Sequence, residues 1–480
     1  MKTKQEYIDS LRKLNPEVYI FGERIGNIVD HPIIRPSIDC VAATYEMAEN
    51  TEYREIITAK SHLTGKVINR FCHIHQSNDD LVKKSKMERG LGAYTGSCFQ
   101  RCVGMDALNA LSIITYNIDQ KHKTNYYQRF LKYLQYVQDE DLTCCGAMTD
   151  AKGDRSLRPA EQADPDQYLH VVKERKDGIV VRGNKLHQTG AVNSHEIICM
   201  PTRAMREEDK DYAISFALPG DAKGIIYIYG RQSCDTRKTE GGDIDTGNIL
   251  YSGQECMVIF DDVFVPWERV FMYKEYEFAA DFVEKFAAYH RQSYACKSGI
   301  GDVLIGSSQL LAEYQGTAGA SHIRSKITEM IHLNETMMCC SLACAYEGHR
   351  EPSGTYFVNT LLANVSKLNV TRFPYEISRL AQEIAGGSLV TMPSEKDLKN
   401  PQIGKLVSKY LKGVEGVKVE DRMRALRLVE NITLGTGAVC YLTESLHGAG
   451  SPEAQKIMIT RESNLGRMKN AAKRLCGIKP

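Results

Sequence analysis

Two short stretches of the sequence hold most of the side chains that could carry out chemistry together. Residues 97–102, SCFQRC, place two thiols four positions apart, and residues 290–297, HRQSYACK, carry an imidazole, a phenol, a thiol and an amine. Several glycines precede the first stretch and indicate a loop, so we expect the two thiols near the start of a helix. Positions i and i+4 of a helix share one face, and Cys98 and Cys102 could therefore bind one inorganic centre together.

The second stretch supplies two more soft ligands. Cys296 and His290 bring the total to four, the number that a 4Fe-4S cluster requires. A buried free cysteine is also common as a small apolar residue of the core, and this interpretation fits any one of the thiols. It fits less well where such groups lie in two tight clusters that also contain Lys297, Tyr294 and Arg101.

Two polar segments and two carboxylates are further candidates. Residues 148–156, MTDAKGDRS, could hold a phosphate or a polar ring edge, although an ordinary surface turn is the simpler interpretation. Residues 187–190, HQTG, could fix a heterocycle or form a capped turn. Glu255 and Glu444 could serve as acid or base if they lie against apolar surroundings, because burial raises the pKa of a carboxyl group. Most glutamates are solvated, so an acid–base function for Glu255 and Glu444 remains open.

The composition limits the classes of function. The chain has 480 residues, and its 61 basic and 60 acidic residues give a formal charge of +1, which does not favour nucleic-acid binding. The N-terminal segment lacks the apolar core of a signal peptide, and no stretch approaches the roughly 18 apolar residues of a membrane span. We therefore expect a cytoplasmic protein whose fifteen cysteines are reduced. Motifs typical of Rossmann, P-loop, zincin and α/β-hydrolase sites are absent.

The order of the patterns predicts an α+β fold with a β-rich middle between two helical parts. Apolar residues recur at helical spacing in Tyr45–Asn69 and Ala107–Val137. Short β-rich runs follow at Tyr168–Val172, Ile179–Arg182, His195–Met200, Tyr212–Ala217, Gly224–Tyr229 and Glu255–Phe260. Helical patterns return at Tyr276–Leu311, His322–Glu347, Tyr356–Ile384 and Val419–Cys440. The expected domains are an N-terminal α domain at 1–137, a middle β domain at 138–275 and a C-terminal α domain at 276–480.

Several ordered blocks of this sequence resemble the 4-hydroxybutyryl-CoA dehydratase family, and the similarity extends over essentially the whole chain. The blocks are Ser97–Asp106, Met148–Ser156, His187–Gly190, Gly230–Lys238, His290–Lys297, Arg372–Gly387 and Thr443–Ser451. The resemblance implies an acyl-CoA-dehydrogenase-like fold, a homotetramer built as a dimer of dimers, an acyl-CoA thioester substrate, and one FAD and one 4Fe-4S cluster per subunit. It also implies radical dehydration of 4-hydroxybutyryl-CoA to crotonyl-CoA, with isomerisation of vinylacetyl-CoA. Transient loss of one electron then acidifies a β C–H bond that ordinary bases cannot break.

The same resemblance implies the residues of the site. The cluster ligands would be Cys98, Cys102, His290 and Cys296. The flavin contacts would be Met148, Thr149, Asp150, Lys152, Asp154, Arg155, His187, Gln188, Thr189, Glu383, Gly386 and Gly387, some of them reaching a neighbouring subunit. The catalytic groups would be His290 as base and ligand, Glu444 and Glu255 as acid and base, Tyr294 and Lys297 as orienting or leaving-group donors, and Thr189 beside the flavin.

One spacing differs from the family pattern. Five residues separate His290 from Cys296, one fewer than in the family, and Ala295 stands where the family has two glycines. On a regular helix, positions i and i+7 differ by about 20° and positions i and i+6 by about 120°. The shorter spacing would rotate Cys296 away from His290, so we expect the helix to break or bulge between them.

Two other functions are compatible with parts of this pattern. A flavin-only enzyme on the same scaffold, such as a 4-hydroxyphenylacetate 3-hydroxylase-like monooxygenase, would need no cluster, and the four soft ligands argue against it. A non-catalytic acyl-CoA- or flavin-binding protein would bind flavin without turning over either thioester. Measured turnover would exclude this third possibility.

Overall fold

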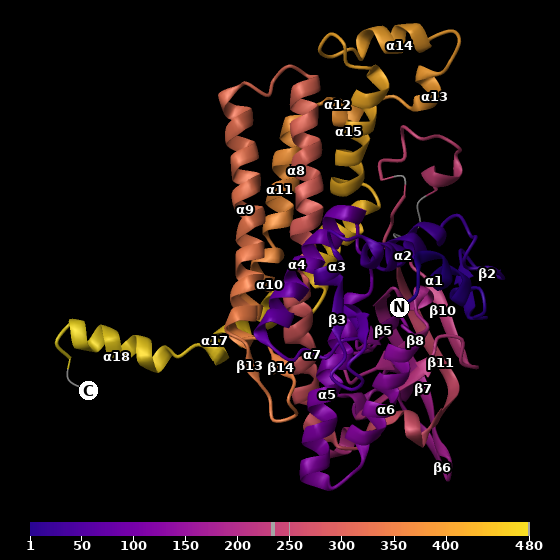
Figure 1. Cartoon of the computed structure of the whole chain (residues 1–480), viewed down its shortest axis with the longest axis vertical. Helices are drawn as coiled ribbons and strands as arrows, with labels where there is room; N and C mark the ends of the chain where they lie inside the picture. Colours follow the sequence, from indigo (N-terminus) through magenta and orange to yellow (C-terminus); the bar gives the residue numbers. More distant parts are fainter. Residues whose placement is uncertain (232–235, 249, 479–480) are drawn as a thin grey trace.

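The computed structural model describes residues 1–231, 236–248 and 250–478, so part of the Gly230–Lys238 block lies outside the described residues. Helices and strands are mixed, as the α+β prediction requires (Figure 1). A six-stranded sheet has the order β2-β1-β10-β11-β7-β6, with strands β1 (Glu17–Ile20), β2 (Glu23–Ile25), β6 (His170–Arg175), β7 (Gly178–Thr189), β10 (Ile225–Tyr229) and β11 (Glu255–Pro266). A four-stranded sheet has the order β12-β9-β8-β5, with strands β5 (Cys144–Ala147), β8 (Glu196–Cys199), β9 (Ile214–Pro219) and β12 (Val270–Tyr273).

The two sheets pack against each other through one apolar core. Val181 and Val258 of the larger sheet share this core with Ile197 and Phe216 of the smaller sheet. In β7 the side chains alternate between buried and partly exposed, as expected for a strand with one face against a core. Strands β6 and β7 pair in antiparallel fashion, which confirms strands where the β-rich runs Tyr168–Val172 and Ile179–Arg182 predict them.

Helices cover the other face of the four-stranded sheet. Side chains of this sheet, among them Ile198 and Phe271, form a second core with Leu111 and Leu134 of two N-terminal helices. The helices of the first part are α1 (Lys4–Leu11), α2 (Arg35–Glu49), α3 (Arg54–Ile57), α4 (Asn78–Thr95), α5 (Cys102–His122) and α6 (Tyr126–Asp139). The smaller sheet therefore lies between the larger sheet and a helical layer.

The last part of the chain forms a bundle of long helices beside the sheets (Figure 1). Its members are α7 (Ala279–Ser293), α8 (Cys296–Tyr314), α9 (Ser321–Tyr346), α10 (Thr360–Val370), α11 (Phe373–Ala385) and α15 (Val419–Thr433). Leu304, Met330, Ile377 and Met423 belong to its apolar core, which accounts for the helical periodicity of this region. This part of the chain also contains shorter helices: α12 (Ser388–Thr391), α13 (Glu395–Leu398), α14 (Gly404–Tyr410), α16 (Glu444–His447), α17 (Pro452–Glu462) and α18 (Leu465–Leu475).

The prediction of one helix over Tyr45–Asn69 is wrong, although its first residues belong to α2 and Arg54–Ile57 form the short helix α3. Helix α2 ends at Glu49, and a small antiparallel pair follows, β3 (Thr58–Lys60) with β4 (Val67–Asn69). Gly65 has a φ of +73° between these strands, which suits a tight turn. Two buried apolar residues of this segment, Ile57 and Ile68, lie in α3 and β4, respectively, so their helical spacing does not come from a single helix.

The first 137 residues also contain two strands that local sequence patterns did not predict. Strand β1 pairs in parallel with β10, and Glu17 lies opposite Ile226. The sequence around Glu17 does not reveal this strand, because a strand of four residues forms only through pairing with its neighbours in the sheet, and these are distant in the sequence. No helix of the described part is long and apolar enough to cross a membrane. The expected domain boundaries stay a prediction.

Candidate functional site

Close contact between helices α4 and α8 determines where Cys296 lies. Both helices present a glycine where they cross: a Cβ atom on Gly92 would collide with the carbonyl oxygen of Cys296, and one on Gly299 would collide with the backbone of α4 at Arg89 and Ala93. Only glycine permits backbones to approach this closely. The first residue of α8 is thereby held against the side of α4.

The two thiols of the first stretch do not share a helix. Cys98 lies in the loop between α4 and α5, and Cys102 is the first residue of α5. Gln100 lies between them with a φ of +64°, a left-handed conformation that turns the chain. The expectation that i and i+4 spacing on a helix brings the thiols together is therefore wrong in its geometry, but the turn still leaves both of them buried.

The chain breaks its helix between His290 and Cys296, as the shortened spacing led us to expect. Helix α7 ends at Ser293 and α8 begins at Cys296. Across the junction the amide of Lys297 bonds to the carbonyl of Tyr294, one of several i to i−3 hydrogen bonds that tighten the turn. The break changes the direction in which Cys296 projects.

The three predicted ligand thiols lie in one buried region. Cys98, Cys102 and Cys296 are each at most 6% exposed, and Cys102 and Cys296 pack in one apolar cluster. Burial raises the pKa of all three thiols, that of Cys296 to about 12, and the electrostatic interactions of Cys102 with both others add to this. Bound metal overrides such a shift, because a coordinating thiol is deprotonated.

The fourth predicted ligand, His290, is held by a buried carboxylate. Its Nδ1 lies 2.9 Å from Oδ2 of Asp106, a residue of α5 that is fully buried. The Lys84 ammonium, also fully buried, lies 2.6 Å from the other carboxylate oxygen, and Ser293 donates to Oδ2 at 2.8 Å. Burial opposes ionisation, but Lys84 and His290 lower the pKa of Asp106 below its ordinary value.

The two candidate carboxylates meet in this region. Burial raises the pKa of Glu255 well above its ordinary value, and the charge of Glu444 raises it further through a hydrogen bond between the two. The Lys297 ammonium lies 2.7 Å from Oε2 of Glu444, and Thr189 donates to Oε1 of Glu255 at 2.6 Å. Two acids in contact favour a state in which they share one proton.

Tyr294 completes this group from the helix break. Its hydroxyl donates to the carbonyl of Glu444 at 3.1 Å, and its ring lies edge-on to the ring of His290 at 5.4 Å. The Lys367 ammonium lies 4.4 Å from the centre of the same ring and donates to the carbonyl of Ser445. The phenol is therefore in place between the imidazole and the carboxylates.

The predicted flavin loop, residues 148–155, follows strand β5. Asp150 is buried and lies 2.8 Å from the Lys185 ammonium, which also bonds to the carbonyl of Met148 at 2.9 Å. Lys185 thus holds the 148–155 loop in place, and Asp150 has a structural function as the partner of Lys185. The amide of Leu186 bonds to the carbonyl of Thr149 at 2.7 Å.

Beyond that anchor the loop faces outward toward His187. Partial burial lowers the pKa of His187, and the charges of Lys152, His447 and Arg155 lower it further. Asp154 is exposed and bonds to Ser156 of its own turn. This part of the site is an open polar surface that joins the 148–155 loop to the end of α16.

Gln188 is buried beside that surface and bonds to a backbone carbonyl in its own strand, so its side chain has a local structural function. Glu383, Gly386 and Gly387 are elsewhere, at the far end of α11. Glu383 pairs with Lys326 at 3.2 Å, and the two glycines face open space. A single chain does not bring these three residues to the remainder of the site.

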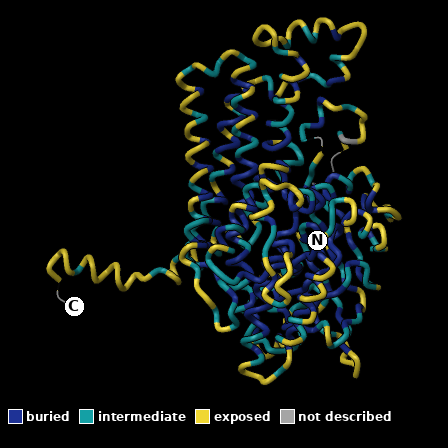
Figure 2. Tube along the Cα trace, in the orientation of Figure 1, coloured by how far each residue is buried: buried dark blue, intermediate teal, exposed yellow. Residues whose placement is uncertain are grey.

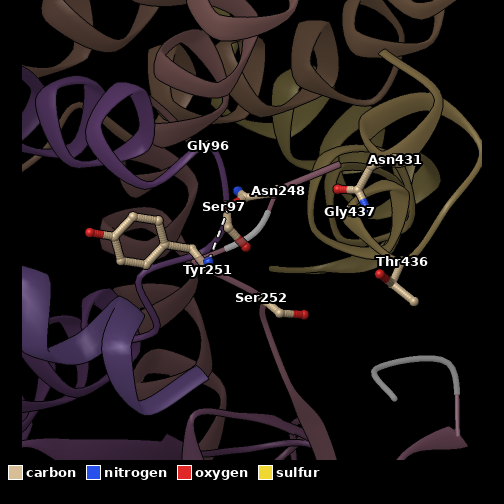
Figure 3. A pocket seen from close by; sticks show the side chains of 8 residues that line it. All are labelled: Gly96, Ser97, Asn248, Tyr251, Ser252, Asn431, Thr436 and Gly437. Carbon is tan, nitrogen blue, oxygen red and sulfur yellow. Dashed lines mark hydrogen bonds between the residues drawn. The ribbon is translucent and has the colours of Figure 1, made fainter. Parts of the chain in front are cut away.

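A shallow surface hollow lies at Ser97, the residue before Cys98 (Figure 3). Its lining residues come from the end of α4, the segment before β11, and the end of α15 with the residues after it: Gly96, Ser97, Asn248, Tyr251, Ser252, Asn431, Thr436 and Gly437. The hydroxyl of Ser97 lies 3.6 Å from the thiol of Cys440, which occupies a π-helical turn, Val439–Thr443. Such turns are frequent at functional sites.

Sequence reasoning did not assign several residues of this region. Asp106 follows Cys102 by one helical turn, and Cys440 precedes Glu444 by one turn, so helical spacing from a candidate could have indicated both. Lys84 and Glu88 gave no such signal. Glu88 is fully buried, and burial raises its pKa well above the ordinary value.

The sequence and the fold are similar to those of known proteins. The chain is 58% identical to 4-hydroxybutyryl-CoA dehydratase/vinylacetyl-CoA-Delta-isomerase of Clostridium aminobutyricum over 100% of both chains. It belongs to the 4-hydroxybutyryl-CoA dehydratase family. A solved oxygen-tolerant archaeal 4-hydroxybutyryl-CoA dehydratase from N. maritimus is 55% identical, with a TM-score of 0.98 over 100% of this chain and 95% of the other.

The chain also matches a wider family that includes hydroxylases. Residues 3–272 match the family described as 4-hydroxyphenylacetate 3-hydroxylase N terminal, and residues 279–477 match the corresponding C terminal family. The 4-hydroxyphenylacetate 3-monooxygenase oxygenase component of Thermus thermophilus is 28% identical over 91% of this chain and 89% of its own. An oxygenase component solved with FAD has a TM-score of 0.85 at 24% identity over 99% of this chain and 98% of the other, which shows the shared fold.

The residues present fit the cofactors of a dehydratase. Among the residues that the structure describes, no three His, Cys, Asp or Glu side chains surround a single metal ion. A 4Fe-4S cluster has a different requirement, because its ligands are distributed over separate iron atoms. Three buried thiols and an imidazole already bound at Nδ1 supply the donor set. The polar surface at His187 suits the edge of a flat heterocycle.

Proposed function

We propose that this protein dehydrates 4-hydroxybutyryl-CoA to crotonyl-CoA and isomerises vinylacetyl-CoA, as a cytoplasmic homotetramer with FAD and a 4Fe-4S cluster. The observation that carries the proposal is the place of the acid pair, Glu255 and Glu444, beside the region of the three buried thiols: Lys297, which follows Cys296, donates to Glu444 at 2.7 Å. The charge of Glu444 acts directly on Cys98. A flavin-only hydroxylase would have no need of such a thiol group.

Cys98, Cys102, Cys296 and Nε2 of His290 would hold the cluster, and the surface at His187 would hold the flavin ring. When bound, the flavin would take up and return one electron, and the cluster iron would act as a Lewis acid at the departing hydroxyl. The protein's own residues would have to bind the thioester, exclude water and move protons.

The acid pair supplies the proton transfers. The shared proton lies between Glu255 and Glu444, so one carboxyl group can donate while the other accepts. Lys297 donates to Glu444 and Thr189 donates to Glu255, and these bonds fix one oxygen of each acid. The other oxygens of the pair would then move a proton to or from a substrate carbon.

Subunit contacts would complete the flavin site. Helix α18 has no buried residue and projects away from the body of the chain (Figures 1 and 2). Its apolar side chains are exposed, Leu465 by 51%, Met468 by 50% and Leu475 by 81%. An apolar helix face of this kind requires a partner. A second copy of this chain would be such a partner, and its surface would also cover Glu383 and the two exposed glycines at the end of α11.

The decisive experiment is to purify the protein without oxygen and to measure iron, acid-labile sulfide and FAD per chain. We expect about four irons and four sulfides per flavin, with turnover of both thioesters. Flavin without iron, combined with hydroxylation of 4-hydroxyphenylacetate, would replace the proposal by the flavin-only function. Flavin without any turnover would indicate a binding protein.

A further inference from the structure

The hydrogen bonds of the His290 ring determine which of its nitrogens is available to a metal. Nδ1 lies 2.9 Å from Asp106, which leaves Nε2 on the opposite side of the ring. Among the described residues, Nε2 has no hydrogen-bond partner. The ring also stacks on Phe286 at 5.5 Å and meets Tyr294 edge-on at 5.4 Å, so it has little freedom to rotate.

The carboxylate that holds the ring is itself unusually well fixed. Each oxygen of Asp106 has a donor: Lys84 at 2.6 Å on one side, and Ser293 and His290 at 2.8 and 2.9 Å on the other. Lys84 also bonds to the carbonyl of Tyr289 at 2.9 Å, and therefore connects helices α4, α5 and α7. A buried charge pair of this kind is costly unless all its groups are paired, and here they are.

One helix supplies both the carboxylate and a predicted ligand. Asp106 follows Cys102 by four residues on α5, so the two side chains project from one face of the helix. The charge of Asp106 acts on the thiol of Cys102 accordingly. A shift of α5 would move the thiol and the support of the imidazole together.

We infer that Asp106, braced by Lys84, is a positioning residue that fixes the orientation of the His290 ring and thereby strengthens the bond between its Nε2 and the cluster. The inference rests on the cluster of the proposed function. A metal-bound histidine usually donates its other N–H to a carboxylate or carbonyl, which fixes the ring and increases its basicity. Asp106 acts only through His290 and does not touch the substrate.

The first test uses the wild-type holoenzyme, purified without oxygen and grown with histidine labelled with nitrogen-15 at either Nδ1 or Nε2. Electron–nuclear double resonance of the reduced cluster should show the strong coupling only for the Nε2 label. Strong coupling for the Nδ1 label would overturn the inference. Protein that binds no iron would instead refute the proposed function, so the two failures can be distinguished.

The second test uses Asp106→Asn, which retains the size of the side chain and removes its charge. We expect iron to be released to a chelator about 10–100-fold more readily, as is typical when the partner of a metal ligand is removed, and the Nε2 coupling to change. Asp209→Asn is the matched control, because Asp209 is a buried carboxylate bonded to Arg158 outside this region. It should retain iron as the wild type does.

A further variant keeps the inference testable if Asp106→Asn does not fold. Asp106→Asn leaves the Lys84 ammonium buried without its counter-charge, which by itself can unfold the protein. In Lys84→Met/Asp106→Asn both charges are removed together, which costs less. A folded variant of either kind that retains iron and the nitrogen coupling of the wild type would overturn the inference.

Discussion

Replacement of Glu444 by Gln tests the acid pair most directly. Gln has nearly the same shape, and its amide oxygen can still accept a hydrogen bond from Lys297, which lies 2.7 Å from Glu444. The variant can no longer share a proton with Glu255. General acid–base catalysis contributes about 10²–10⁴-fold, so we expect turnover of vinylacetyl-CoA to fall by that factor, or about 2.7–5.5 kcal/mol in the activation barrier.

The same replacement predicts a change in the pH profile. Burial and the charge of Glu444 both raise the pKa of Glu255. The neutral amide removes the second cause, so this pKa must fall. If Glu255 acts as an acid, the alkaline limb of the residual activity moves to lower pH; if it acts as a base, the acidic limb moves the same way.

The assay is isomerisation of vinylacetyl-CoA followed as a function of pH under anoxic conditions, with flavin and iron measured on the same samples. Glu196→Gln is a matched control, because Glu196 is buried and paired with Arg269 at 2.7 Å outside the site. It should leave the profile unchanged. Full turnover of Glu444→Gln, or a limb displaced to higher pH, would refute the reasoning. Loss of flavin would show that Glu444 is structural.

Three further predictions concern the thiols, the ion pair and the crossing of helices. Cys98→Ala should lose the cluster and dehydratase activity, and full activity in an iron-free variant would contradict the mechanism. Lys297→Met should lower stability by about 3–5 kcal/mol because it leaves a buried carboxylate unpaired; in thermal unfolding, Lys297→Met/Glu444→Gln should recover most of this loss, whereas an additive loss would refute the coupling. Gly299→Ala should cost about 1–3 kcal/mol through overpacking against α4, and Gly306→Ala, on the same helix but open to solvent, should not.

The sequence by itself predicted the general architecture because periodicity reports which face of an element is buried. The β-rich runs of the middle part and the long helices of the last part follow from it. The break between His290 and Cys296 was predicted from the resemblance to the dehydratase family, whose spacing is one residue longer. The identities of the candidate ligands and acids also came from the sequence, since they depend on residue type and order.

Only the tertiary structure decided how these groups meet. Strand β1 exists because β10 lies beside it, and Cys98 reaches Cys102 through a left-handed turn at Gln100. The carboxylate of Asp106 and the ammonium of Lys84 are 22 residues apart in sequence and 184 and 206 residues from His290, respectively. Charge, burial and proton sharing are properties of neighbours in space, and a linear pattern does not contain them.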